Sequence, residues 1–316
     1  LDGNGGEDSC SADGDDGDNT PYIIDGVLAT ESVYDAVVSL HQLSRDQQSV
    51  YRSPFCTGTL IRNNIVLTAA HCLEGSKKDP VFTNFLVYTG YDPTNYLNQG
   101  QYIVDNPSMQ HMIVDAVIHT DYDRKQLGND IALVTLENAI PATDITPIAC
   151  VGASTKDLVF VDAKIEFAGF GQNSIRDPDP PLKRKGSGQI TGLTKGPGIR
   201  YGQTQGPCYG DSGGPAFVFD EGGTQYVAGV TAYGDSECAD FGVSTDVRAF
   251  EVWINGYISP GVGAPPGMAP PPERNCEGHT SKDECEKKGK EKGKEKDKGK
   301  DKGKQCKWDK KNGKCK

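Results

Sequence analysis

Three short segments of this chain hold residue types that can do chemistry together. The segments are LTAAHC at Leu67–Cys72, NDIAL at Asn129–Leu133 and GDSGGP at Gly210–Pro215. Their reactive residues are His71, Asp130 and Ser212. A serine hydroxyl is a weak nucleophile until a neighbouring base takes its proton, and a carboxylate behind an imidazole fixes the tautomer of that base. The three residue types therefore indicate acyl transfer through a serine nucleophile.

The chain around these segments has the pattern of an all-β domain that ends in a helix. Short apolar runs broken by Gly, Pro, Asn and Asp are typical of strands and turns. Examples are Phe82–Tyr88, Met112–Ile118, Val159–Phe167 and Tyr226–Thr231. A different spacing, that of one helical face, is shared by Phe250, Trp253, Ile254, Tyr257 and Ile258. We therefore expect strands up to about residue 249 and a closing helix after them.

In their types and their order, the three segments resemble those of the trypsin/chymotrypsin family of serine proteases, over Ile23 to Ile258. The resemblance implies an all-β fold of two Greek-key antiparallel β-barrels with a C-terminal helix. It implies a serine endopeptidase in which Ser212 is the nucleophile, His71 the general base and Asp130 the residue that orients it. It also implies an oxyanion hole formed by the backbone amides of Gly210 and Ser212.

The segment Ile23–Gly26 (IIDG) is similar to the start of the mature enzymes of that family. The resemblance implies cleavage of the Tyr22–Ile23 bond, after which the new amine of Ile23 pairs with Asp211. Residues 1–22 would then be an acidic activation peptide and the chain a zymogen. Most family members have Arg or Lys before the cleaved bond, so Tyr22 is a departure. If the enzyme cuts after aromatic residues, as its S1 pocket implies below, it could cleave after Tyr22 itself. Self-activation is therefore a hypothesis beside activation by another protease.

Ten cysteines, an even number, favour disulfides and an oxidising, extracellular compartment, so we expect a secreted protein. The resemblance implies the pairs Cys10–Cys150, Cys56–Cys72 and Cys208–Cys238. Four more cysteines surround a Lys-rich insert and predict a small disulfide-stapled module; they are Cys276, Cys285, Cys306 and Cys315. The acidic run at residues 13–18 lacks the ligand spacing of a calcium loop. We expect no cofactor and no metal site.

Substrate preference depends on the S1 pocket, which in the family binds P1, the residue whose carbonyl is cut. The residue six positions before the nucleophile lines its base, and an Asp there selects Arg or Lys. This chain has Gly206 at that position, with Gly234 and Gly242 mapping to the walls and Tyr233 to the edge. The resemblance therefore implies a deep, uncharged pocket, which favours a large apolar or aromatic P1 residue.

Two alternatives remain open. The first is a trypsin-like preference for a basic P1 residue, for which acidic side chains near the rim offer carboxylates; these are Asp235, Glu237 and Asp240. The second is a non-catalytic protease homologue that acts as a binding protein. Such homologues usually lack a triad residue, and this chain has all three.

The net charge of −11 is unevenly distributed, because residues 1–22 have no basic side chain and residues 273–316 are net positive. An acidic body does not suit nucleic acid, and no apolar run approaches the ~18 residues that span a membrane. The expected partners are protein or peptide substrates and an activating protease. The tail either contacts anionic surfaces or is a solvated spacer.

We expect four parts along the chain. They are an acidic activation peptide at 1–22, a serine protease domain at 23–260, a Pro/Gly linker at 261–274 and a Lys-rich four-cysteine module at 275–316. Within the protease domain, the basic run Lys183–Lys185 is expected in an exposed loop that is open to proteolysis.

Overall fold

The computed structural model describes residues 23–24, 26–42, 54–74, 85–93, 96–97, 101–102, 107–173, 181–258, 308–309 and 314–315. These residues belong to two units, which divide between Ile254 and Asn255. In the second unit, β16 (Trp308–Asp309) pairs antiparallel with β17 (Lys314–Cys315). The predicted activation peptide, the linker and most of the four-cysteine module lie outside the described residues.

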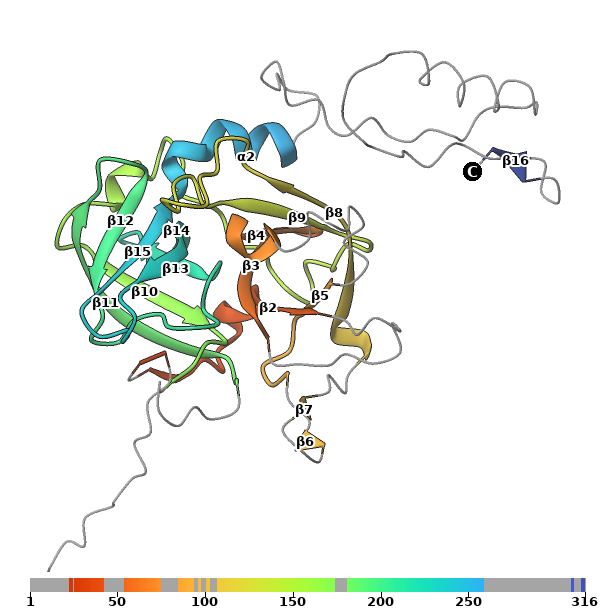
Figure 1. Ribbon diagram of the computed structural model, residues 1–316, viewed down its shortest axis with the longest axis horizontal. Coiled ribbons are helices and arrows are strands. Elements are labelled where there is room, and N and C mark those ends of the chain that lie inside the picture. The colour runs from red at the N-terminus through yellow and green to blue at the C-terminus, as the bar shows by residue number, and fades with distance from the viewer. Residues whose placement is uncertain are drawn as a thin grey trace, which may run out of the picture. The chain divides into compact units, whose positions relative to one another are not determined.

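Six strands of the first unit close into a barrel (Figure 1). They are β2 (Val37–Gln42), β3 (Cys56–Arg62), β4 (Ile65–Thr68), β5 (Phe85–Tyr88), β8 (Gln110–Ile118) and β9 (Ala132–Leu136). The pairing order around the barrel is β2-β3-β4-β9-β8-β5, so the fourth strand returns to the first. Aliphatic side chains with no solvent exposure fill the barrel, among them Val38, Leu60, Val66, Val87 and Val134.

A second set of six strands repeats this order. They are β10 (Lys164–Gly169), β11 (Arg184–Leu193), β12 (Gly198–Gly202), β13 (Pro215–Phe219), β14 (Gln225–Gly234) and β15 (Phe241–Asp246). Their sheet runs β11-β10-β13-β14-β15-β12, and the pairing of β11 with β12 closes it. Each barrel thus joins its strands in the order first, second, third, sixth, fifth, fourth, and the predicted two-barrel fold is confirmed.

The remaining elements are short. β1 (Val27–Leu28) extends the second barrel by pairing with β11, and β6 (Tyr96–Leu97) pairs with β7 (Gln101–Tyr102). Short 3-10 turns cover Ser32–Tyr34, Pro107–Met109, Lys156–Leu158 and Val247–Phe250. The α-helices among the described residues are α1 (Ala70–Leu73) and α2 (Glu251–Ile258). Phe250, Trp253 and Ile254 are buried, as the helical spacing predicted.

One predicted strand is only partly correct. The apolar run Val159–Phe167 forms a strand only from Lys164 onward. Before that point the chain follows a 3-10 turn and then reverses at Asp162, whose φ of 73° lies in the left-handed region. Phe160 and Val161 are exposed as a result, so the apolar run is not continuous with the core.

The prediction for the basic run Lys183–Lys185 is wrong. The run lies where β11 begins, and both Lys183 and Arg184 are only 2% exposed. The N-terminal segment covers them, because β1 pairs with β11 and the Lys183 ammonium donates to the carbonyl of Tyr34 at 3.0 Å. Buried lysines are rare without such a partner, which explains why a charged triplet reads as exposed in the sequence.

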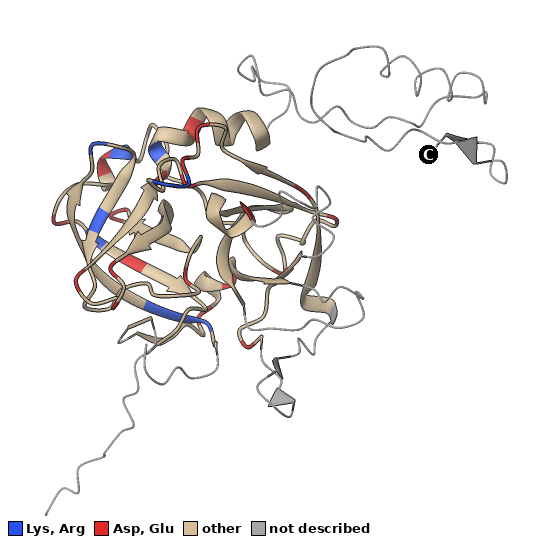
Figure 2. Cartoon of the chain, viewed as in Figure 1, with Lys and Arg blue, Asp and Glu red and all other residues tan. Residues whose placement is uncertain are grey.

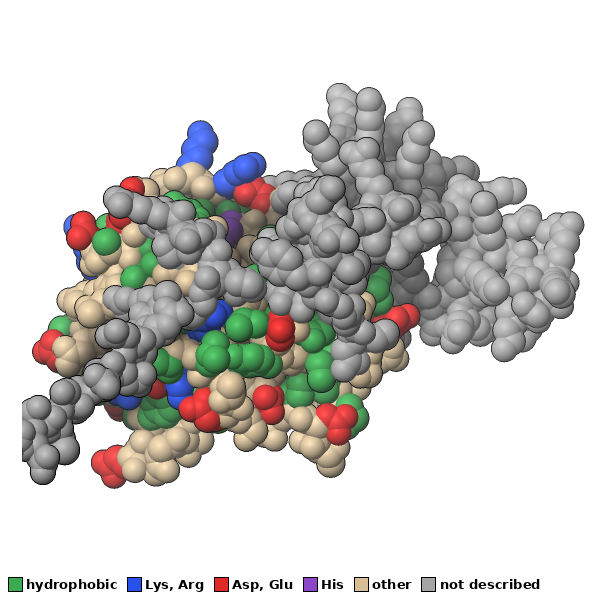
Figure 3. Space-filling model, turned by 90° about the horizontal axis from the view of Figure 1, so that it is seen from below, with side chains coloured by type: hydrophobic (Ala, Val, Ile, Leu, Met, Phe, Trp, Pro, Cys, Tyr) green, Lys and Arg blue, Asp and Glu red, His purple; other side chains and the backbone are tan. Residues whose placement is uncertain are grey.

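Charged side chains of both signs are scattered over the described part of the first unit. Lys and Arg are spread over the described ribbon, and many Asp and Glu residues lie in turns (Figure 2). On the face seen in Figure 3, apolar side chains gather near the middle and acidic ones are interspersed among them. No helix among the described residues is long and apolar enough to cross a membrane.

Candidate active site

The strand register of the first barrel brings His71 and Asp130 to the same place. β4 and β9 are antiparallel neighbours in which Thr68 lies opposite Ala132. His71 is the third residue after the end of β4 and lies in the first turn of α1, and Asp130 stands two residues before β9 begins. Both residues therefore emerge at one end of the same strand pair.

Two hydrogen bonds join these residues. The His71 ring nitrogen Nδ1 lies 2.6 Å from Oδ2 of Asp130, and the backbone N–H of His71 donates to Oδ1 at 2.9 Å. Asp130 has no solvent exposure, whereas the His71 side chain is 26% exposed. Because an ionised carboxylate only accepts hydrogen bonds, this contact places the ring proton on Nδ1 and leaves Nε2 as a base.

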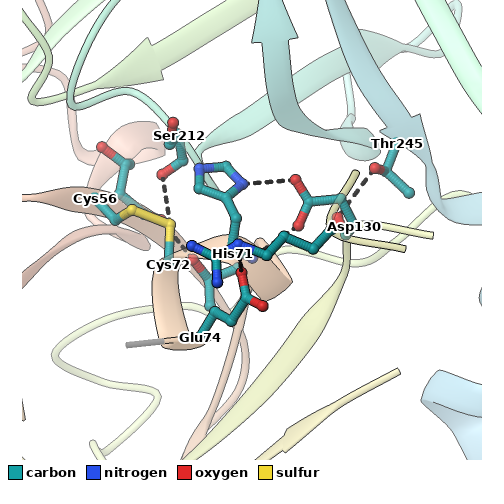
Figure 4. Close-up of polar contacts among 10 residues, drawn as sticks. Cys56, His71, Cys72, Glu74, Asp130, Ser212 and Thr245 are labelled. Atoms are coloured by element: carbon teal, nitrogen blue, oxygen red, sulfur yellow. Dashed lines mark hydrogen bonds and ion pairs between the residues drawn. A yellow bond between two sulfur atoms is a disulfide. The ribbon is translucent and has the colours of Figure 1, made fainter. Parts of the chain in front are cut away.

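Ser212 comes from the second barrel, in the loop before β13. Figure 4 shows the Ser212 side chain and the Asp130 carboxylate on opposite sides of the His71 ring. No hydrogen bond connects the hydroxyl to the ring among these described residues. Such contacts are often long in free enzymes and shorten when substrate binds.

Contacts between the barrels hold the site together. The N–H of Thr57, in β3, donates to the carbonyl of Ser212 at 2.8 Å. In the other direction, the Thr245 hydroxyl in β15 donates to the carbonyl of Asp130 at 3.0 Å. The Cys72 sulfur also lies 3.6 Å from the Ser212 carbonyl oxygen, but a disulfide sulfur has no hydrogen to donate, so this is packing.

The loop around Ser212 has a backbone conformation that requires glycine at position 210. Gly210 has a φ of +100°, and a Cβ at this position would lie 2.9 Å from the Cα of Gly171. Only glycine fits there without strain. The N–H groups of Gly210 and Ser212 have no acceptor among the residues that the structure describes. These are the two N–H groups that we expect to form the oxyanion hole.

Asp211 is a buried carboxylate, 1% exposed. Its oxygens accept from the N–H of Gly171 at 2.8 Å and from the N–H of Cys208 at 3.0 Å. Burial raises the pKa of Asp211 to about 6, although these two bonds and the nearby Arg184 charge lower it. Ile23 is also buried, at 1% exposure, and still joined to Tyr22, which lies outside the described residues.

Two disulfides brace these loops, and both are among the three pairs that the resemblance implies. Cys56–Cys72 ties α1 to β3, and Cys208–Cys238 ties the Ser212 loop to the turn after β14. Cys150 has no disulfide partner among the described residues, and Cys10, its expected partner, lies outside them. Burial raises the pKa of the Cys150 thiol to about 12. Cys56, Cys72 and His71 lie close together, but their bonded sulfurs are not metal ligands.

A family model described as Trypsin matches residues 36–254. The chain belongs to the trypsin family. Among curated proteins, this trypsin-family chain is 29% identical to vitamin K-dependent protein C of Rattus norvegicus, over 64% of this chain and 46% of that protein. It is 27% identical to transmembrane protease serine 11C of Mus musculus, over 67% of this chain and 49% of that protein. Coagulation factor XI of Bos taurus is also 27% identical, over 73% of this chain and 37% of that protein. The chain spans about half the length, or less, of these relatives.

Beside Ser212, this trypsin-family chain has a pocket of about 220 Å³. Its lining is Tyr201, Gln203, Pro207, Cys208, Tyr209, Ser212, Thr231, Ala232, Tyr233, Gly234, Asp235 and Cys238. Tyr233 and Gly234 line the pocket at the predicted positions. Gly206 and Gly242, which the sequence placed at its base and wall, are not in the lining.

The pocket differs from the deep one that the three glycines imply, because two side chains occupy the space they leave. A Cβ on Gly206 would lie 1.5 Å from Oε1 of Gln203. A Cβ on Gly242 would lie 2.3 Å from the ring of Tyr201. Gln203 therefore closes the base and Tyr201 forms the wall. Neither Gln203 nor Tyr201 was predicted as a pocket residue, and the one sequence signal for them is the space left by glycine at positions 206 and 242.

Among the acidic residues expected near the rim, Asp235 has a structural role. Both carboxylate oxygens of Asp235 accept backbone N–H bonds, and the donors are Glu237, Ala239, Asp240 and Phe241. These bonds hold the pKa of Asp235 down at about 2. The carboxylate is thus turned to its own loop, which it holds in a tight turn at the pocket mouth.

Proposed function

We propose that this chain is the zymogen of a secreted serine endopeptidase with the triad His71, Asp130 and Ser212. The observation that carries the proposal is the 2.6 Å contact between His71 Nδ1 and the fully buried Asp130, with Ser212 on the other side of the ring (Figure 4). That arrangement leaves Nε2 as a base facing the hydroxyl side.

In the proposed reaction the Ser212 oxygen attacks the carbonyl carbon of the substrate while Nε2 of His71 takes its proton. Asp130 stabilises the imidazolium that forms. The N–H groups of Gly210 and Ser212 donate to the negative oxygen of the tetrahedral intermediate. His71 then gives its proton to the departing amine, and water repeats the sequence to release the acyl group from Ser212.

Activation is proposed to require cleavage between Tyr22 and Ile23. The new amine of Ile23 would pair with the carboxylate of Asp211. In the uncleaved chain this buried carboxylate accepts two backbone N–H bonds, and Ile23 has no free amine to offer it. Burial disfavours the ionised form of this carboxylate, so pairing with the new amine would stabilise the Gly210–Ser212 loop next to it. Either another protease or a second copy of the enzyme would make the cut.

For P1 we propose a large apolar or aromatic side chain. The pocket beside Ser212 has aromatic side chains in its wall and rim, and the carboxylate of Asp235, its one acidic lining residue, already accepts backbone hydrogen bonds.

Secretion is supported by the two disulfides, which persist in oxidising compartments. The proposed partners are protein or peptide substrates, and contact of the basic tail with anionic surfaces is tested by deleting residues 261–316 and comparing retention at low and high salt.

The test of the main proposal is covalent labelling. An enteropeptidase recognition sequence in place of residues 18–22 allows controlled cleavage before Ile23. A fluorophosphonate probe should label the cleaved protein at Ser212, label the uncleaved protein far more slowly and leave the Ser212→Ala protein unlabelled. Absence of label on the cleaved, folded protein would instead identify a non-catalytic homologue.

A further inference from the structure

The base of the pocket is formed by the carboxamide of Gln203, a residue just after β12 that is only 4% exposed. The amide lies across the pocket between two glycines. Its Oε1 is at the place that a side chain on Gly206 would fill, and a Cβ on Gly234 would lie 3.2 Å from its Nε2. An Asp at position 206 would place a carboxylate here. With Gly206, the carboxamide of Gln203 occupies this space instead.

The orientation of this amide is fixed by one contact. Its Nε2 donates to the carbonyl of Pro207 at 2.9 Å. A carbonyl accepts only from a donor, so the NH₂ faces Pro207 and the oxygen is the other atom. Oε1 has no hydrogen-bond partner among the residues that the structure describes. A buried carbonyl oxygen left unpaired is unfavourable and is satisfied when a donor arrives.

Aromatic side chains make up part of the lining of this pocket, and Asp235 is its one acidic lining residue. The Tyr201 ring packs against Gly242, and its hydroxyl already accepts from Ser244 at 3.3 Å. Tyr209 and Tyr233 stand at the rim, 55% and 39% exposed. A P1 side chain that fits this pocket therefore needs a flat apolar body and a hydrogen-bond donor at its tip.

We propose that Gln203 is a specificity-determining residue and that it selects tyrosine at P1, whose hydroxyl donates to Oε1. The inference rests on the proposed peptidase function. Phenylalanine would fill the same space but leave the oxygen unpaired. Lysine would bury a cation without a counter-charge, because Asp235 is held by its own loop. Glutamine offers donors but lacks the flat apolar body. The residue before the proposed activation bond, Tyr22, meets the requirement.

The experiment compares kcat/KM for matched peptides that differ only at P1, carrying Tyr, Phe, O-methyltyrosine, Gln or Lys. We expect Tyr to exceed Phe by about 10- to 100-fold, since one buried acceptor is paired or not. O-methyltyrosine keeps the ring and the oxygen but has no donor, so it should fall to or below Phe. A ratio of Tyr to Phe near one, or faster cleavage after Gln or Lys, would overturn the proposal.

Two variants locate the effect. Gln203→Leu and Gln203→Met both remove the acceptor, and each should lower the ratio of Tyr to Phe at least about fivefold. Gln225→Leu is the matched control: Gln225 is also buried with an unpaired Oε1, but it does not line the pocket, so the ratio should be unchanged. An unchanged ratio in both Gln203 variants contradicts the proposal.

Titration of Ser212 with the fluorophosphonate separates the two hypotheses. If the wild-type cleaved protein is not labelled, the peptidase function itself fails. If it is labelled but shows no preference for Tyr over Phe, only the assignment of Gln203 fails.

Discussion

Asp130 holds His71 at two points, its ring and its backbone. One carboxylate oxygen lies 2.6 Å from Nδ1 and the other accepts from the main-chain N–H at 2.9 Å. The side chain thereby sets both the tautomer of the imidazole and the position of the helix turn that bears it. Because Asp130 has no solvent exposure, water does not compete for either bond.

Replacing this carboxylate by an amide should leave the fold intact and stop catalysis. In Asp130→Asn one acceptor oxygen becomes a donor, so the ring turns to the wrong tautomer and Nε2 no longer takes the serine proton. We expect kcat to fall by about 10⁴, the loss typical of this change, with KM little altered. Steady-state kinetics with a peptide ester check this. The exposed Asp162, whose left-handed backbone suits Asn, provides the control Asp162→Asn.

Gly210→Ala should damage the proposed oxyanion site selectively. The φ of +100° disfavours any Cβ, and the added atom would press on the Cα of Gly171. The loop must shift, which moves one of the two donors, and loss of one donor typically lowers kcat by about 10²–10³. Reaction of the variant with a fluorophosphonate should slow to a similar degree. The change Gly222→Ala, in an exposed turn with a neighbour at 3.3 Å, should have little effect on either rate.

The buried Asp211 predicts an unusual pH dependence for the uncleaved chain. Its pKa of about 6 lies above the ordinary 3.8, so the folded state binds the proton more tightly than the unfolded state. Its contribution to stability is full below about pH 4 and declines as pH rises through 6. Between pH 5 and 7.5 the free energy of unfolding should drop by roughly 1–1.5 kcal/mol from this group.

Urea denaturation of the uncleaved Ser212→Ala protein at both pH values measures the drop, and the same pair of measurements on Asp211→Asn subtracts other groups. Equal pH dependence with and without Asp211 would show that this carboxyl titrates normally. After cleavage before Ile23, the amine should stabilise the ionised form and remove the drop.

The burial of Lys183 and Arg184 predicts resistance to trypsin. A protease needs several residues of extended, accessible chain, and this run is paired with β1 and β10. Cleavage after these residues should therefore require global unfolding, whereas Arg124, whose side chain is 77% exposed, should be cut in the native state. Mass spectrometry of a native trypsin digest compares the two sites. Early cleavage after Lys183 would contradict the buried position.

Three local motifs led to His71, Asp130 and Ser212, whose catalytic roles stay predictions. The family resemblance that these motifs carry implied the two barrels and the two disulfides that the structure confirms. The glycines around Ser212 and the short apolar runs of the strands are examples of such local signals. Prediction from the sequence failed where side chains from elsewhere in the chain occupy a site. The Gln203 side chain occupies the space beside Gly206, and the spacing of apolar residues in a sequence does not show which way a polar side chain points. Lys183 is buried only because a segment about 150 residues earlier in the chain pairs with β11.

Each barrel holds the backbone of a residue from the other: Thr57 binds the Ser212 carbonyl, and Thr245 binds the Asp130 carbonyl. Neither half has a complete set of groups. During synthesis, the half with His71 and Asp130 leaves the ribosome well before Ser212 is made. A nascent or truncated chain that lacks the second barrel therefore cannot bring His71, Asp130 and Ser212 together.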